Sequence, residues 1–188
     1  MTTEPASTRE PKPVDIGGAR NTAILMGALA ALSWPFFGAD NPIVALLVTF
    51  CTANLGIAAI PLALRIPARW YRVRPGERIL HWLLGVPVFG WLLDKSGWNR
   101  SVALPMRNLK VERASLPRLL TNINAAEGAH ALAFIPHLAL ALLAFLTGHS
   151  QGALWILLPG IVLHLYPVLL QRWMTLRVAP LVRRSGAD

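Results

Sequence analysis

The sequence has one cysteine in 188 residues, and only 14% of its residues are charged. The single cysteine, Cys51, excludes an internal disulfide and a thiolate metal cluster. Soluble domains usually carry about 25% charged residues, so the deficit indicates a chain that meets lipid as well as water. Acidic residues are scarce too, because nine Asp and Glu stand against 18 Lys and Arg, a formal net charge of +9. A basic surplus of this size suits a nucleic acid, a membrane surface or phosphate ligands.

Hydrophobic residues are abundant instead, at 54% of the chain with a mean hydropathy of +0.48. They predict an all-α integral membrane protein with about four transmembrane helices, each apolar segment being long enough to cross a bilayer. The predicted spans are residues 22–38, 42–64, 125–147 and 151–170. The last two are separated by three residues only and form a helical hairpin. Residues 1–21, rich in Thr, Ser, Pro and charge, are predicted as a disordered leader to a single membrane domain, 22–188.

A fifth apolar stretch, residues 79–93, is short for a span and is interrupted by glycine and proline. Trp82 and Trp91 suit the boundary between lipid and water. We therefore expect residues 77–94 to form an interfacial or re-entrant helix within a basic cytoplasmic connection, and residues 171–188 to form a basic tail.

The positions of the basic residues support this arrangement. Three lie in the first 20 residues, eleven lie in residues 65–124 and four follow Leu170, whereas the short loops 39–41 and 148–150 hold none. Because Lys and Arg accumulate in cytoplasmic connections, four spans with both termini inside are expected, in a multi-pass protein of the cell membrane. The basic residues flank the spans and form no separate domain, so a nucleic-acid partner is not expected.

Few polar residues interrupt the apolar segments, and these are the first site candidates. Glu127 and His130 lie three residues apart on one helix face, a spacing that suits a general base with a carboxylate beside it. The alternative is that Glu127 caps the helix and His130 reaches the interface. Asn54 and His164 are expected in the same inner half of the membrane.

A second pair, Glu77 and His81, lies four residues apart at the start of the interfacial stretch. The spacing suits either a site or a solvated first turn. A metal site is not expected, because only one Glu-x-x-His motif is present where a di-iron bundle needs two. Haem ligation by His137 and His164 is a further alternative.

Several blocks occur in an order that resembles a known family. Ala53-Asn54-Leu55-Gly56 is followed by Arg65-Ile66-Pro67, then Ala126-Glu127-Gly128-Ala129-His130, then Tyr166-Pro167 with Gln171-Arg172-Trp173 and Arg177. This order, from residue 53 to the C-terminus, resembles the glycosyl-diaponeurosporenoate acyltransferases, small integral membrane enzymes that acylate a sugar on a carotenoid. His164 stands where the family has Asn, and Met174-Thr175 where it has Asn-Arg.

The resemblance implies transfer of a fatty acyl group from a thioester, acyl-CoA or similar, to a sugar hydroxyl of a glycosylated carotenoid or related glycolipid. No cofactor is expected beyond acyl-CoA as co-substrate. Our hypothesis makes His130 the base and Glu127 the group that orients it, with Asn54 binding the acceptor or the oxyanion. The remaining candidate substrate-binding residues are Glu77, His81, His164, Arg65, Arg172 and Arg177, the arginines holding donor phosphates or the interface. The alternative is a non-catalytic small membrane subunit, or a lipid- or haem-binding module.

Overall fold

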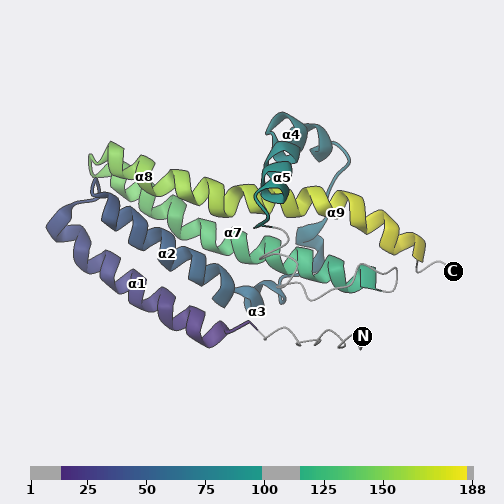
Figure 1. Cartoon of the computed structure of the whole chain (residues 1–188), viewed down its shortest axis with the longest axis horizontal. Helices are drawn as coiled ribbons and strands as arrows, with labels where there is room; N and C mark the ends of the chain where they lie inside the picture. Colours follow the sequence, from purple (N-terminus) through teal and green to yellow (C-terminus); the bar gives the residue numbers. More distant parts are fainter. Residues whose placement is uncertain (1–13, 99–114, 186–188) are drawn as a thin grey trace, which may run out of the picture.

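A computed structural model describes residues 14–98 and 115–185, and every regular element in these ranges is a helix. Residues 1–13 of the predicted leader, 99–114 of the basic connection and 186–188 of the tail lie outside the described residues. The long helices lie side by side, α1 against α2, α2 against α7, and α7 against α8 and α9 (Figure 1). The all-helical prediction is confirmed for the described residues.

The first two helices match the predicted spans approximately. Helix α1 runs over Ile16–Phe37 and begins inside the predicted leader, because the Asp15 carboxylate accepts from the Gly18 N–H and caps the helix. Helix α2 runs over Pro42–Ala58, and a short α3, Ile60–Ala63, follows it. The proline in α3 has no N–H to donate to the preceding turn, so one predicted span, 42–64, becomes two helices.

Two helical segments are long and apolar enough to cross a membrane. One is α7, Leu116–Leu146; the other is the continuous helix Ser150–Ser185, made of α8 (Ser150–Gly160), a π-helical turn (Ile161–Leu165) and α9 (Tyr166–Ser185). At 1.5 Å per residue the 31 residues of α7 extend ~46 Å, well beyond a hydrocarbon core of about 30 Å. Both helices therefore continue past the predicted spans 125–147 and 151–170, and residues 171–185 extend α9.

The predicted interfacial segment 77–94 forms two short helices, α4 (Glu77–Leu83) and α5 (Val86–Lys95), after a 3-10 turn at Ala68–Tyr71. Gly85, with φ of +69°, makes the break between them. Helices α4 and α5 project from the side of the bundle across α9 (Figure 1). The Tyr166 hydroxyl donates to the Leu84 carbonyl at 3.1 Å, and its ring lies 5.0 Å from that of Phe89.

Small residues form the core, and large apolar residues face outward. The main core cluster consists of Ala30, Ala39, Ala45, Val48, Ala141, Ala144, Ala153 and Ile156. Exposed large apolar side chains cover α1, α2, α7 and α8, among them Ile24, Leu32, Leu46, Ile135, Leu142 and Leu158. Close packing through small residues with large apolar side chains outside is typical of helices that associate in lipid.

One end of the bundle is joined by a polar contact between two loops. The Asp40 carboxylate bonds His149 Nδ1 at 2.8 Å and accepts from the Gly152 N–H at 2.7 Å. Gly152 lies against the Ala39 carbonyl and leaves no room for a Cβ atom. The hydrogen bond with His149, and then the one from Gly152, hold the pKa of Asp40 below its usual value. The α1–α2 loop is thereby attached to the start of α8.

We predict that Asp40→Ala lowers the midpoint of thermal unfolding of the detergent-solubilised protein, because both bonds are lost. A carboxyl with a lowered pKa stabilises the folded state above its unfolded pKa, and this contribution is lost as the pH falls through the folded value. The difference from wild type should therefore persist from pH 7 to 5 and shrink below about pH 4. Asp94→Ala, at an exposed carboxylate on α5, is the control; equal midpoints for both variants would contradict the prediction.

Candidate active site

Arg172 on α9 joins three elements of the chain. Its Nε and Nη2 groups donate to both oxygens of Glu77 at 2.8–3.0 Å. Its Nη1 group donates to Glu127 Oε1 on α7 at 2.8 Å, and Nη2 also reaches the Arg72 carbonyl at 3.3 Å. The planar fork of five N–H donors suits two carboxylates at once. This bridge fixes the start of α4 against α7 and α9.

Five buried polar atoms without a hydrogen-bond partner among the described residues belong to the bridge residues or to residues near them along the same helices. Glu127 is buried, and its second oxygen, Oε2, is one of them. The others are Asn124 Oδ1, Gln171 Oε1, Thr175 Oγ1 and His81 Nδ1. Each belongs to a residue within about one helical turn of Glu77, Glu127 or Arg172 along its helix. We call Glu77, His81, Asn124, Glu127, Gln171, Arg172 and Thr175 the polar cluster.

The α4 side of the polar cluster combines a charged and a neutral group. Burial by itself raises the pKa of Glu77, but the hydrogen bonds from the Arg74 N–H and Arg172 outweigh it and hold this pKa below its usual value. Burial lowers the pKa of His81 by more than the Glu77 carboxylate raises it. His81 packs edge-on against Trp173, which in turn carries the Arg177 guanidinium 5.0 Å from its ring centre. Near pH 7 a carboxylate and a neutral imidazole therefore lie side by side.

Three histidines and one threonine form a second group, which we call the histidine chain. His130 Nδ1 lies 3.4 Å from His164 Nδ1, and His164 Nε2 lies 3.4 Å from Thr52 Oγ1. Thr52 Oγ1 is 2.6 Å from His137 Nε2, and His137 Nδ1 is 3.0 Å from the Ile156 carbonyl. His137 and His164 are buried, whereas His130 is partly exposed.

Local backbone features place these side chains. The π-helical turn Ile161–Leu165 carries His164 and follows Pro159, and π-helical turns occur frequently at functional sites. A Cβ atom at Gly160 would fall 2.8 Å from His137 Cγ, so only glycine lets that ring reach Ile156. Gly128 has a similar role, because a Cβ atom there would meet the Tyr71 hydroxyl, which donates to the Ala63 carbonyl.

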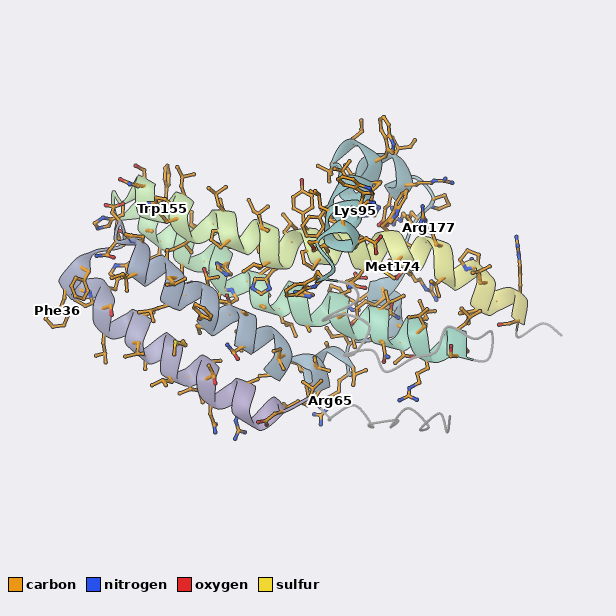
Figure 2. The ribbon with its side chains drawn as sticks, viewed as in Figure 1. Phe36, Arg65, Lys95, Trp155, Met174 and Arg177 are labelled. Carbon is orange, nitrogen blue, oxygen red and sulfur yellow. The ribbon has the colours of Figure 1, made fainter. Side chains whose placement is uncertain are left out.

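Most predicted site residues come together. Glu77, His81, Glu127 and Arg172 meet in the polar cluster, while His130 and His164 meet in the histidine chain. Asn54 does not join either group, since its amide donates to the Phe50 carbonyl of its own helix. Arg65 and Arg177 are exposed and lie on opposite sides of the bundle, Arg65 near α3 and Arg177 on α9 near α4 (Figure 2).

Two predicted contacts are replaced by others. Glu127 bonds Arg172 and His130 bonds His164, so neither orients the other. The reason is geometric: Glu127 and His130 are ~4.5 Å apart along α7, but their partners are eight residues, or ~12 Å, apart along the continuous helix Ser150–Ser185. The two side chains therefore diverge. Arg172, predicted to hold donor phosphates, is committed to carboxylates instead.

The haem alternative is not supported by the contacts of His137 and His164. Both Nε2 atoms, which would have to face a common iron, are turned to Thr52 Oγ1. Within residues 14–98 and 115–185, no group of three or more His, Cys, Asp and Glu side chains is arranged to hold a metal ion.

Several residues of the site escaped sequence reasoning. Thr52, Asn124, Gln171 and Thr175 carry uncharged polar groups that also occur widely in helices without a function. Their helical spacing is the available signal: Asn124 precedes Glu127 by three residues, and Gln171 and Thr175 lie four apart around Arg172. Asn124 thus shares a helix face with Glu127, and Thr175 shares one with Arg172, both charged residues already selected.

The comparisons with known proteins bear on the part of the chain that holds the polar cluster. A model of the glycosyl-4,4'-diaponeurosporenoate acyltransferase family matches residues 67–184. This range includes the whole polar cluster and all three histidines of the histidine chain, while Thr52, Asn54 and Arg65 precede it. Comparison with curated proteins and with solved structures gave no match. Since the family model covers more than half of the sequence and agrees with the block order, the chain belongs to the glycosyl-4,4'-diaponeurosporenoate acyltransferase family.

Proposed function

We propose that this protein is a membrane acyltransferase that moves a fatty acyl group from a thioester, such as acyl-CoA, to a sugar hydroxyl of a glycosylated carotenoid or related glycolipid. The observation that carries the proposal is the set of five buried polar atoms that have no hydrogen-bond partner among the described residues. One of them belongs to Glu127, which lies about one helical turn from His130 on α7. Buried polar groups are nearly always hydrogen-bonded, so a ligand that satisfies several of them is strongly favoured.

The chemistry of these atoms favours a ligand rich in hydroxyl groups. The amide oxygens Asn124 Oδ1 and Gln171 Oε1 accept hydrogen bonds and cannot donate them. The same holds for Glu127 Oε2 when the carboxyl group is ionised. Thr175 Oγ1 and His81 Nδ1 can donate or accept. A sugar supplies O–H donors to the three acceptors and hydroxyl oxygens to the remaining two. The apolar part of such a glycolipid would lie against the exposed apolar side chains of the helices.

His130 is the proposed base for the reaction. Its imidazole takes the proton of the sugar hydroxyl, and the oxygen attacks the thioester carbonyl carbon. As the tetrahedral intermediate collapses, the C–O bond is kept and the C–S bond breaks, and the imidazolium returns the proton to the departing thiolate. Glu127 Oε2, on the same face of α7, accepts a hydrogen bond from a second sugar hydroxyl and holds the acceptor in place.

We further propose that α1 and α2 cross the bilayer together with α7 and α8. Their exposed large apolar side chains support this arrangement, because such a surface would be unfavourable in water. Phe36 and Trp155 lie at the end of the bundle opposite Arg177 (Figure 2), as expected of residues at the outer interface. Helices α4 and α5, with exposed Trp82 and Trp91, then lie at the inner interface.

An anionic donor such as acyl-CoA would approach from this inner interface. The segment after α3 and the end of α9 carry exposed arginines there: Arg65, Arg69, Arg72, Arg74, Arg78, Arg177, Arg183 and Arg184. Guanidinium groups bind phosphate well, and these eight are not committed to the buried carboxylates as Arg172 is.

The topology is testable by thiol labelling, because Cys51 is the sole cysteine. In a Cys51→Ala background, Ser150→Cys should react with a membrane-impermeant thiol reagent in intact cells. Ser96→Cys, at the end of α5, should react only after permeabilisation. The reverse pattern, or equal reaction at both positions, would contradict four spans with the α7–α8 loop outside.

We expect His130→Ala to lower acyl transfer in membranes by about 100-fold or more, the usual contribution of a general base. Incorporation of a labelled acyl group into the glycolipid measures it, at matched protein level. His149→Ala makes the same change at the other end of the helices and should keep activity. If His130→Ala remains fully active, His130 is not the base. If membranes that lack the protein transfer acyl groups equally well, a non-catalytic membrane module becomes the better description.

Gln171→Leu and Thr175→Val test the sugar site. Each removes a buried polar group without a described partner, so unfolding temperature should stay unchanged or rise, while KM for the acceptor increases roughly fivefold at unchanged KM for the donor. Gln151→Leu and Thr121→Val, at exposed positions, are the matched controls. If KM for the donor rises instead, these residues bind the donor and not the acceptor, which would contradict the proposed sugar site.

A further inference from the structure

We infer that Thr52, His137 and His164 act as positioning residues that hold His130 in a single tautomer, with the proton on Nδ1 and the free electron pair on Nε2. This inference rests on the proposed role of His130 as the base. It follows from the direction in which each hydrogen bond of the histidine chain must run. The direction is set at the buried end, by the backbone carbonyl of Ile156.

The first step is at His137. A carbonyl oxygen only accepts, so His137 Nδ1, 3.0 Å from the Ile156 oxygen, must carry the proton. The ring has no exposed surface, and burial disfavours the charged imidazolium. A neutral imidazole carries one N–H, so His137 Nε2 is an acceptor.

The second step assigns the hydroxyl proton of Thr52. Val48 and Thr49 carbonyls lie 3.0 and 3.1 Å from Thr52 Oγ1, but His137 Nε2 lies at 2.6 Å. If the hydroxyl proton pointed to either carbonyl, two electron pairs would face each other at this shortest contact. Thr52 therefore donates to His137 and has only electron pairs left for other partners.

The third step carries the direction to His130. His164 Nε2 faces the Thr52 oxygen at 3.4 Å and must donate to it, which makes His164 Nδ1 an acceptor. His130 Nδ1, 3.4 Å away, then donates to His164. The remaining nitrogen, Nε2, keeps its electron pair for the sugar hydroxyl.

The histidine chain fixes the tautomer of His130 and does not conduct protons. A path must hand a proton on at both ends, and the Ile156 carbonyl has no proton to give or exchange. The charged groups nearest to His130 along α7 and α9 are Glu127 and Arg172, which are paired with each other. Only His130, the partly exposed member, is open to a substrate.

Thr52→Val tests the inference, because it removes the hydroxyl and keeps the branched shape. NMR of nitrogen-labelled histidine in the detergent-solubilised protein should show His130 protonated at Nδ1 in wild type, and a mixture of tautomers in Thr52→Val. With acyl transfer measured in parallel, kcat should fall about tenfold with acceptor KM unchanged, roughly the effect of one lost hydrogen bond. Thr52→Ser, which restores the hydroxyl, should return both readouts toward wild type.

Thr49→Val is the matched control, since the Thr49 hydroxyl bonds only its own helix, at the Ala45 carbonyl. It should change neither the tautomer nor kcat. Protonation of His130 at Nε2 in wild type, or an unchanged tautomer in Thr52→Val, would overturn the inference. The NMR result does not depend on activity, so the inference about the tautomer can fail while wild type still transfers acyl groups. Absence of any transfer by wild type would reject the proposed function alone.

Discussion

The bridge from Arg172 to Glu77 and Glu127 is the interaction on which the site depends. It joins residues 95 and 45 positions apart in sequence, and it brings α4, which has little buried surface of its own, against α7 and α9. Two carboxylates face one guanidinium, with Glu127 buried and Glu77 and Arg172 partly exposed, and removing Arg172 would leave the Glu127 charge buried without its partner. The bridge thus joins α7, which carries Asn124, to α9, which carries Gln171 and Thr175.

In the membrane setting proposed above, polar contacts specify this architecture. Helices with apolar side chains outside gain little by burying similar side chains inside, so association relies on close approach and on hydrogen bonds. Gly128, Gly152 and Gly160 supply the close approach, each at a point where a Cβ atom would meet a neighbour. The hydrogen bonds lie at separate depths: Asp40 with His149 at one end, the histidine chain in the middle, and Arg172 at the other end. Each contact then fixes the helix register at its own level.

The sequence predicted the helical class, the α7–α8 hairpin and most of the charged site residues, because each depends on local pattern: apolar length, three-residue loops, or an ionisable group in an apolar run. It did not predict pairing across helices. Glu127 and His130 share a face of α7, yet Glu127 bonds Arg172 of α9 and His130 bonds His164 of the π-helical turn. This choice depends on helix register, which a local pattern does not contain. The π-helical turn at His164 could not be predicted either, because proline and glycine, the residue types at positions 159 and 160, also occur in helices without such a turn. Asn54 was selected for its polarity in an apolar segment and for its place in the first matching block, and its amide bonds the Phe50 carbonyl of its own helix.

The separation of Glu127 from His130 strengthens the case for a reaction between them. A glutamate that oriented His130 would use its free oxygen on the ring and leave nothing for a substrate. With Arg172 holding Glu127 Oε1 and His164 holding His130 Nδ1, each residue keeps one uncommitted atom, an acceptor on Glu127 and, by the direction of the histidine chain, an acceptor on His130. Two acceptors one turn apart suit two hydroxyl groups of one sugar ring. In the proposed reaction, one hydroxyl anchors the ring, while the other loses its proton and attacks the thioester.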